Sequence, residues 1–139
     1  MTICTKERAQ ILGTVVGGGV LDAPCVQLSE FGVIVERRIQ AVSEQYDRIT
    51  IPHYVIMPNH LHMMIVVEEG SSRTPTPTNQ TIPALVSTIK RMTNRDAGVV
   101  LWQRGYHDHI IRDENDFLRH WNYIDINPAK WSEDEYYCV

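Results

Sequence analysis

The sequence lacks the features of a membrane-spanning or exported protein. Its longest apolar run, Met63 to Val67, is far shorter than the roughly 18 residues that cross a bilayer. The first eight residues contain no apolar stretch of the kind that signal peptides carry. We therefore expect a cytoplasmic protein that has no membrane partner.

Cysteine is also scarce and is not arranged in pairs. Cys4, Cys25 and Cys138 are odd in number and widely spaced, and none belongs to a C-x-x-C motif. This pattern excludes a disulfide framework and a zinc ribbon. We expect three free thiols.

Basic residues do not dominate the chain. The 13 Lys and Arg residues are outnumbered by 17 Asp and Glu, for a net charge of -4, which argues against a surface that binds nucleic acid throughout. Residues 81–112 differ, because they contain five basic and two acidic residues, a local charge of +3. These basic residues either form a solvated surface or contact phosphate groups; they are Lys90, Arg91, Arg95, Arg104 and Arg112.

The length of 139 residues and the 43% hydrophobic content suit one globular domain, residues 1–139, with one core. Local patterns predict strands at 2–5, 25–28, 49–57, 61–67 and 106–112, helices at 30–46, 81–94 and 113–127, and a flexible loop at about 69–81. The strands at 49–57 and 61–67 form a hairpin through Pro58 and Asn59. This order indicates an α+β fold, an antiparallel ferredoxin-like sheet with helices packed against it.

His60 and His62 follow the hairpin turn on the same strand. Because side chains alternate along a strand, both imidazoles project from one face, while Leu61 and Met63 project from the other. Two neighbouring imidazoles can bind one divalent metal ion. The spacing alone is unspecific, and surface or hydrogen-bonded histidines are the alternative.

The last predicted helix has a polar face. Helical spacing places on one side Asp116, Arg119, His120, Tyr123 and Asn127. Tyr123 is therefore expected to point away from the core, and the amide of Asn127 could add an oxygen ligand to a metal ion. Pro128 disfavours helical geometry at Asn127. A rival metal site is His107-Asp108-His109, although Asp108 points to the opposite face of a strand from the two histidines.

Two separated motifs, in the right order, resemble a known family. The segment Tyr54-Val55-Ile56-Met57-Pro58-Asn59-His60-Leu61-His62 is similar to the Met-Pro-Asn-His-hydrophobic-His signature of single-tyrosine HUH transposases. The segments His109 to Glu114, Asp116-Phe117 and Tyr123 to Pro128 resemble one branch of them, the REP-associated tyrosine transposases. The resemblance runs from Thr2 to about Trp131.

The resemblance implies a ferredoxin-like sheet with the two histidines on a central strand and a nucleophilic tyrosine on a C-terminal helix. It assigns His60, His62 and Asn127 to a divalent metal ion, Mg²⁺ or Mn²⁺, and Tyr123 to attack on phosphorus. The partner would be single-stranded or hairpin DNA, cleaved and rejoined through a 5′-phosphotyrosine by a monomer or homodimer. His109 and His120 are candidates to support the metal ligands.

Other functions remain open at this point. Relative to the family, the chain begins inside the expected first strand and ends soon after the tyrosine helix, so an inactive remnant is one alternative. A non-catalytic nucleic-acid-binding or protein-binding module is another. A metallohydrolase of small molecules, using His60, His62 and the segment 107–109, is a third.

Overall fold

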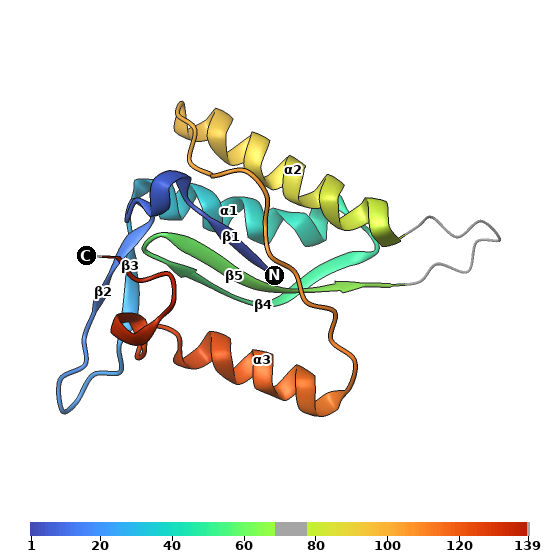
Figure 1. The fold of residues 1–139 in the computed structure, drawn as a ribbon. Helices are drawn as coiled ribbons and strands as arrows, with labels where there is room; N and C mark the ends of the chain where they lie inside the picture. The colour runs from blue at the N-terminus through green and yellow to red at the C-terminus, as the bar shows by residue number, and fades with distance from the viewer. Residues whose placement is uncertain (69–77, 139) are drawn as a thin grey trace.

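The computed structural model describes residues 1–68 and 78–138 and is built on an antiparallel sheet. Strands β4 (Ile49–Met57) and β5 (His60–Val67) form the predicted hairpin through Pro58 and Asn59, with Met57 opposite His60. Strand β1 (Thr2–Cys4) pairs with the first residues of β5, so β5 is the middle strand (Figure 1). The histidine pair therefore lies on a central strand.

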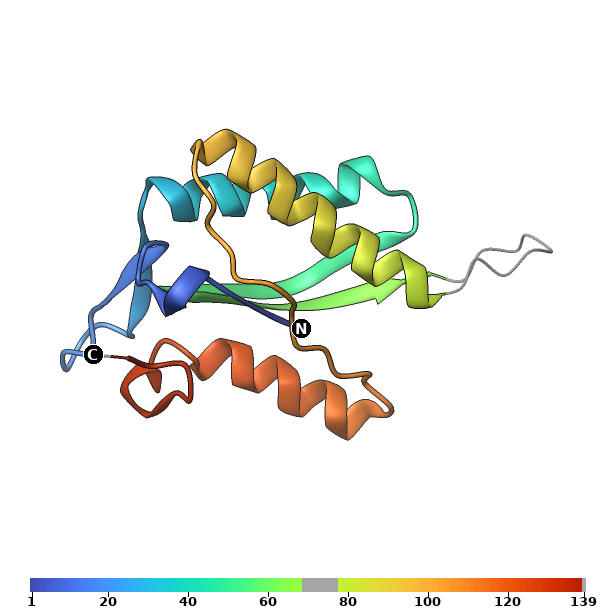
Figure 2. The same cartoon turned by 45° about the horizontal axis from the view of Figure 1, so that its top comes forward.

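Helices cover both faces of this sheet. The helices α1 (Glu30–Gln45) and α2 (Thr78–Ala97) pack on one face, and α3 (Glu114–Ile126) lies across the other (Figure 2). Leu61 and Met63 are buried in the core beneath α1 and α2. The predicted α+β ferredoxin-like class is confirmed.

A small second hairpin precedes α1. Strands β2 (Gly13–Val16) and β3 (Cys25–Leu28) pair antiparallel, and Gly17 and Gly18 make the turn with positive φ angles of 86° and 96°. The strand predicted at 25–28 is thus confirmed. Ser29 then caps α1, because its side chain accepts a hydrogen bond from the backbone N–H of Gly32.

The predicted strand at 106–112 is wrong. Residues 101–107 run beside β1 and form only isolated bridges, Thr5 with Trp102 and Thr2 with His107. The partner strand β1 has only three residues, and beyond His107 the chain must cross to the other face of the sheet to reach α3 (Figure 2). The backbone hydrogen bonds to β1 therefore end at His107, and no strand forms over residues 106–112.

The start of α2 also differs from expectation. The helix begins at Thr78, so Thr81 is not its cap and Pro83 lies inside it. Residues 78–81 of the expected loop are therefore helical, whereas residues 69–77 lie outside the described part of the chain. None of the helices in the described ranges is long and apolar enough to span a membrane.

We predict that Gly32→Ala destabilises the fold. A Cβ atom at Gly32 would collide with the backbone carbonyl oxygen of Leu12 and press on Leu28, and overpacking of this kind costs about 1–3 kcal/mol. Urea denaturation measures the loss. Gly19→Ala is the matched control, because a Cβ there has no atom within 4 Å; equal stabilities of the two variants would contradict the packing argument.

A candidate metal centre beside Tyr123

The two histidines of β5 lie side by side on the face of the sheet that α3 covers. Their ring centroids are 4.4 Å apart, and the residues are 0% and 5% exposed. Burial lowers the pKa of His60 to about 4 and that of His62 to about 2. Both imidazoles are therefore neutral near pH 7, which is the form that binds metal ions.

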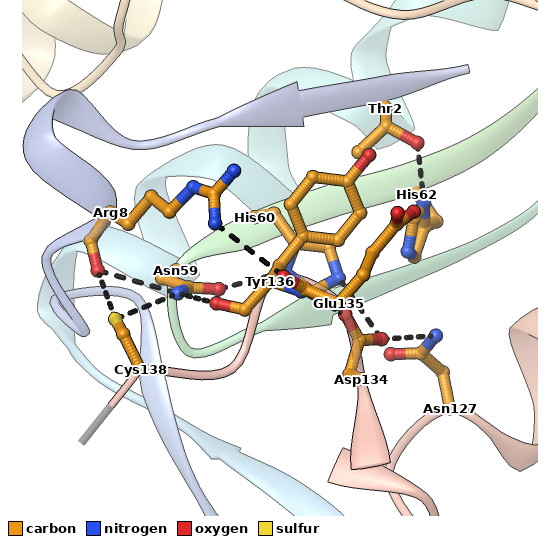
Figure 3. Close-up of polar contacts among 10 residues, drawn as sticks. All are labelled: Thr2, Arg8, Asn59, His60, His62, Asn127, Asp134, Glu135, Tyr136 and Cys138. Atoms are coloured by element: carbon orange, nitrogen blue, oxygen red, sulfur yellow. Dashed lines mark hydrogen bonds and ion pairs between the residues drawn. The ribbon is translucent and has the colours of Figure 1, made fainter. Parts of the chain in front are cut away.

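Each imidazole makes a polar contact through its Nδ1 atom. His60 Nδ1 lies 2.8 Å from Oδ1 of Asn59, while the amide Nδ2 of Asn59 donates to the carbonyl oxygen of Tyr136 at 2.7 Å (Figure 3). The Asn59 oxygen can only accept, so His60 carries its proton on Nδ1. His62 Nδ1 lies 2.7 Å from Oγ1 of Thr2. Both Nε2 atoms thus point away from these supports.

Three buried polar atoms of this site have no hydrogen-bond partner among the described residues: His60 Nε2, His62 Nε2 and Asn127 Oδ1. An unsatisfied buried polar atom costs about 1–3 kcal/mol, so their presence together indicates a missing ligand. Two imidazole nitrogens and an amide oxygen suit a divalent cation. The residues therefore fit the metal that the resemblance implies.

Asn127 reaches this position because α3 stays helical to its end. Its φ and ψ angles are −56° and −45°, and its backbone N–H points to the Ile124 carbonyl at 3.4 Å. The expected distortion by Pro128 is absent, since a following proline disfavours helical geometry without forbidding it. Tyr123 and Asn127 therefore lie one helical turn apart on the same side of α3.

Asp134 joins the site from the segment that follows α3. Its Oδ2 accepts a hydrogen bond from Asn127 Nδ2 at 3.2 Å and lies 4.0 Å from His60 Nε2 (Figure 3). Sequence analysis missed this residue, because it sits in an acidic stretch, Glu133-Asp134-Glu135, that resembles a solvated tail. No local spacing signals that one of these three carboxylates is buried.

Tyr123 lies outside the apolar core, as the helical spacing predicts, and its ring contacts His62 of the histidine pair. Its ring packs edge-on against His62 at 5.1 Å, and 40% of the residue remains exposed. Burial, followed by the charge of Asp134, raises the pKa of its phenol. Tyr123, His62 and Arg119 line an open pocket of about 550 Å³. Tyr123 is therefore accessible from this pocket.

His109 and His120 do not support the metal ligands as predicted. They lie near the start of α3, where the rings stack at 4.6 Å and both contact the Asp116 carboxylate, at 2.8 and 3.2 Å. His120 Nδ1 also lies 2.8 Å from the Asp116 carbonyl oxygen. Asn59 and Thr2 take the supporting positions instead, because among the described residues it is their side chains that reach the Nδ1 atoms of the pair.

The expected rival site His107-Asp108-His109 does not form as a unit. His107 bridges to Thr2 through the backbone, whereas the side chain of His109 turns to Asp116 on α3. The cluster around Asp116 could in principle hold a metal ion. Its atoms are already hydrogen-bonded to one another, however, so they lack the unpaired atoms that distinguish the His60 site.

The predicted DNA-binding residues are dispersed. Lys90, Arg91 and Arg95 lie on α2, across the sheet from α3 (Figure 2). The Lys90 ammonium donates to the carbonyl oxygens of Gln103 and Gly105 at 2.8 and 2.6 Å, so it holds the connecting segment. Arg104 and Arg112 are exposed on that segment. Arg119 is the lysine or arginine that lines the pocket. Its helical spacing indicated only a place on the polar face of the last helix.

A stacked pair holds the middle of α3 on the sheet. His53 of β4 stacks on Trp121 with 4.1 Å between ring centroids, and its Nε2 lies 2.8 Å from the Asp125 carboxylate. Sequence analysis missed these contacts, because they join residues that are 68 and 72 positions apart. These contacts hold α3, and Tyr123 with it, against the sheet beside the histidine pair.

The fold and this site together define a class of protein: a ferredoxin-like domain with a histidine pair on the central strand and a tyrosine on the helix that crosses it. A REP-associated tyrosine transposase bound to a REP hairpin has this fold, with a TM-score of 0.65 and 23% identity over 96% of this chain and 67% of that one. No protein-family model matches the chain.

Sequence comparison points to the same class. An uncharacterized protein of Haemophilus influenzae is 29% identical over 99% of this chain and 83% of its own length. The REP-associated tyrosine transposase of Escherichia coli is 28% identical over 55% of this chain and 42% of its own length. These comparisons confirm the expected resemblance to REP-associated tyrosine transposases, in fold over almost the whole chain and in sequence over about half of it.

We predict that the metal-free protein loses stability below pH 6.5. Unfolded histidines take up protons near pH 6.5, whereas burial keeps the pKa of His60 near 4 and that of His62 near 2 in the folded state. The unfolded state therefore binds more protons as the pH falls, and the free energy of unfolding decreases by up to about 1.4 kcal/mol per pH unit for each histidine.

Urea denaturation in EDTA at several pH values measures this slope. His62→Gln should make it shallower, and the same change at the exposed His107 should leave it as in the wild type. An unchanged slope in His62→Gln would show that the buried pair does not control the pH dependence.

Proposed function

We propose that this protein is a metal-dependent single-stranded DNA endonuclease and strand transferase that acts through a 5′-phosphotyrosine on Tyr123. The observation that carries the proposal is the group of three unpaired buried ligand atoms, on His60, His62 and Asn127, beside an accessible tyrosine. This combination provides a place for a cation and a nucleophile next to it.

The proposed reaction exchanges one phosphodiester for another. The Tyr123 oxygen attacks phosphorus and gives up its proton, the bond from phosphorus to the 3′ oxygen breaks, and that oxygen leaves with a proton as a 3′-hydroxyl. A divalent cation held by His60, His62 and Asn127 would stabilise charge on the phosphoryl oxygens and favour the phenolate. Because the two ester bonds are similar in energy, a new 3′-hydroxyl can reverse the step and join strands.

The comparison with a hairpin-bound transposase supports hairpin-forming DNA as the substrate. Arg119 lines the pocket beside Tyr123 and can contact a phosphate group close to the reacting bond. The exposed Arg104 and Arg112 lie on the connector to α3 and would contact DNA farther from the site. Arg91 and Arg95 would contact it only from the other face of the sheet.

A second tyrosine makes the choice of nucleophile testable. The ring of Tyr136 lies 4.7 Å from His60 and 5.9 Å from His62, so both tyrosines approach the same pair. Tyr136 is only 9% exposed, and burial raises its pKa to about 12. Tyr123 is more accessible and lines the pocket, so it is the better nucleophile.

We predict that Tyr123→Phe abolishes a covalent protein–DNA product, whereas Tyr136→Phe retains it. Labelled single-stranded hairpins are incubated with the purified protein and Mn²⁺, and a denaturing gel detects the adduct. His60→Ala and EDTA should also remove the adduct, because both empty the metal site.

The outcomes separate the competing functions. An adduct that persists in Tyr123→Phe and is lost in Tyr136→Phe would assign the wrong tyrosine. The absence of any adduct, with equal DNA binding by the wild type and all variants, would overturn the catalytic proposal and favour a binding module or an inactive transposase. Hydrolysis that does not require Tyr123 would favour a metallohydrolase.

A further inference from the structure

We infer that Asp134 is a fourth protein ligand of the metal ion that His60, His62 and Asn127 would hold. This inference rests on the metal site of the proposed function and extends it to a residue outside both sequence motifs. The ligand atoms of His60, His62 and Asp134 all lie within 4.8 Å of one another. The ion proposed for this site is a hard divalent cation such as Mn²⁺.

The Asp134 carboxylate is buried. The Asp134 side chain is only 3% exposed, and the only basic group within 4.0 Å of it among the described residues is His60. The two atoms, His60 Nε2 and Asp134 Oδ2, are too far apart for a hydrogen bond, so the carboxylate has no direct basic partner in this buried place. Burying a carboxylate without such a partner is costly, and a bound metal ion would supply one.

Two hydrogen bonds fix the orientation of the Asp134 carboxylate. Its Oδ1 accepts a hydrogen bond from the Tyr136 backbone N–H at 2.7 Å, and its Oδ2 accepts one from Asn127 Nδ2 at 3.2 Å. The Asn127 amide nitrogen thus donates its hydrogen bond to Asp134, and the amide oxygen Oδ1 remains without a partner. Asp134 would therefore orient the Asn127 oxygen toward the metal ion and also provide a carboxylate oxygen as a ligand.

The cluster at the start of α3 differs from the surroundings of Asp134. Asp116 is also surrounded by two histidines, yet each of those contacts is a hydrogen bond of 2.8 Å or a close polar contact of 3.2 Å. At Asp134 the histidine nitrogen nearby is 4.0 Å away and unpaired. That separation is too long for a hydrogen bond and leaves room for an ion between the two atoms.

A fourth ligand has a consequence for the proposed chemistry. Two imidazoles, an amide oxygen and a carboxylate leave two of the six positions of a Mg²⁺ or Mn²⁺ ion for phosphate oxygens or water. The carboxylate also adds negative charge, which strengthens the binding of a hard cation. Substrate would therefore meet a metal site that is largely complete before DNA arrives.

The test is the binding of Mn²⁺ alone, measured by titration calorimetry and by the electron paramagnetic resonance signal of the free ion. We expect Asp134→Asn to weaken Mn²⁺ binding at least about tenfold, and Asp134→Glu to retain more of the affinity because it keeps the carboxylate. Glu135→Gln is the matched control, since it removes the same charge one residue away and should bind as the wild type does.

Thermal unfolding in EDTA separates a ligand from a structural residue. Asp134→Asn should melt at the wild-type temperature or above it, because it removes an uncompensated buried charge, and it should lose most of the rise in melting temperature that Mn²⁺ gives the wild type. A variant that melts well below the wild type in EDTA and binds Mn²⁺ unchanged once folded would overturn the inference.

The result is independent of nuclease activity. Equal Mn²⁺ affinity in the wild type and Asp134→Asn overturns the fourth ligand while the Tyr123 adduct can still establish the enzyme. Loss of Mn²⁺ binding in Asp134→Asn, with no adduct on any hairpin, would support the ligand and overturn the proposed function. A wild type that binds no Mn²⁺ would overturn both.

Discussion

The site depends on one buried amide. Asn59 stands in the turn between β4 and β5, is fully buried, and accepts from the His60 ring while donating to the carbonyl oxygens of Tyr136 and Arg8. The N-terminal segment, the central hairpin and the C-terminal segment therefore meet at a single side chain. Because its oxygen sets the tautomer of His60, the same contact that joins three parts of the chain also directs a nitrogen toward the candidate metal.

The position of the tyrosine helix follows from polar contacts more than from apolar packing. Of the residues of α3, only Asp116 and Ile124 are buried, and none belongs to the apolar core cluster. Its location depends on the stacking of His53 against Trp121 and on the bond between His109 and Asp116. A helix held in this way covers the face of the sheet that carries the histidine pair.

Much of this arrangement could be predicted from local sequence. Alternation on β5 correctly separates Leu61 from His60 and His62, and the Asp113 cap and the end near Asn127 define α3 closely. These features depend on neighbours in the chain, which a single sequence displays. The fold class follows from the order of such elements.

The remaining features depend on contacts through space. Asp134 looks like one carboxylate of a solvated stretch, and nothing near it in the sequence indicates that it meets His60 across 74 positions. In the sequence, Lys90 is a candidate to bind phosphate. In the structure, its ammonium group donates hydrogen bonds to the backbone carbonyls of Gln103 and Gly105. The strand expected at 106–112 likewise depends on a partner in space, and the only pairing that this segment makes with β1 is an isolated bridge at His107.

The charge distribution links these observations to the proposed reaction. Residues 113–139 contain two basic and seven acidic residues, a local charge of -5, and this is the part of the chain that carries Tyr123 and encloses the histidine pair. Such a region repels a phosphate backbone unless positive charge is added at the point of contact. Arg119, one of the two basic residues in this count, lines the pocket. Under the proposed function, a divalent cation against Asp134 would add positive charge beside Tyr123, so the metal would help to admit the substrate as well as assist its cleavage.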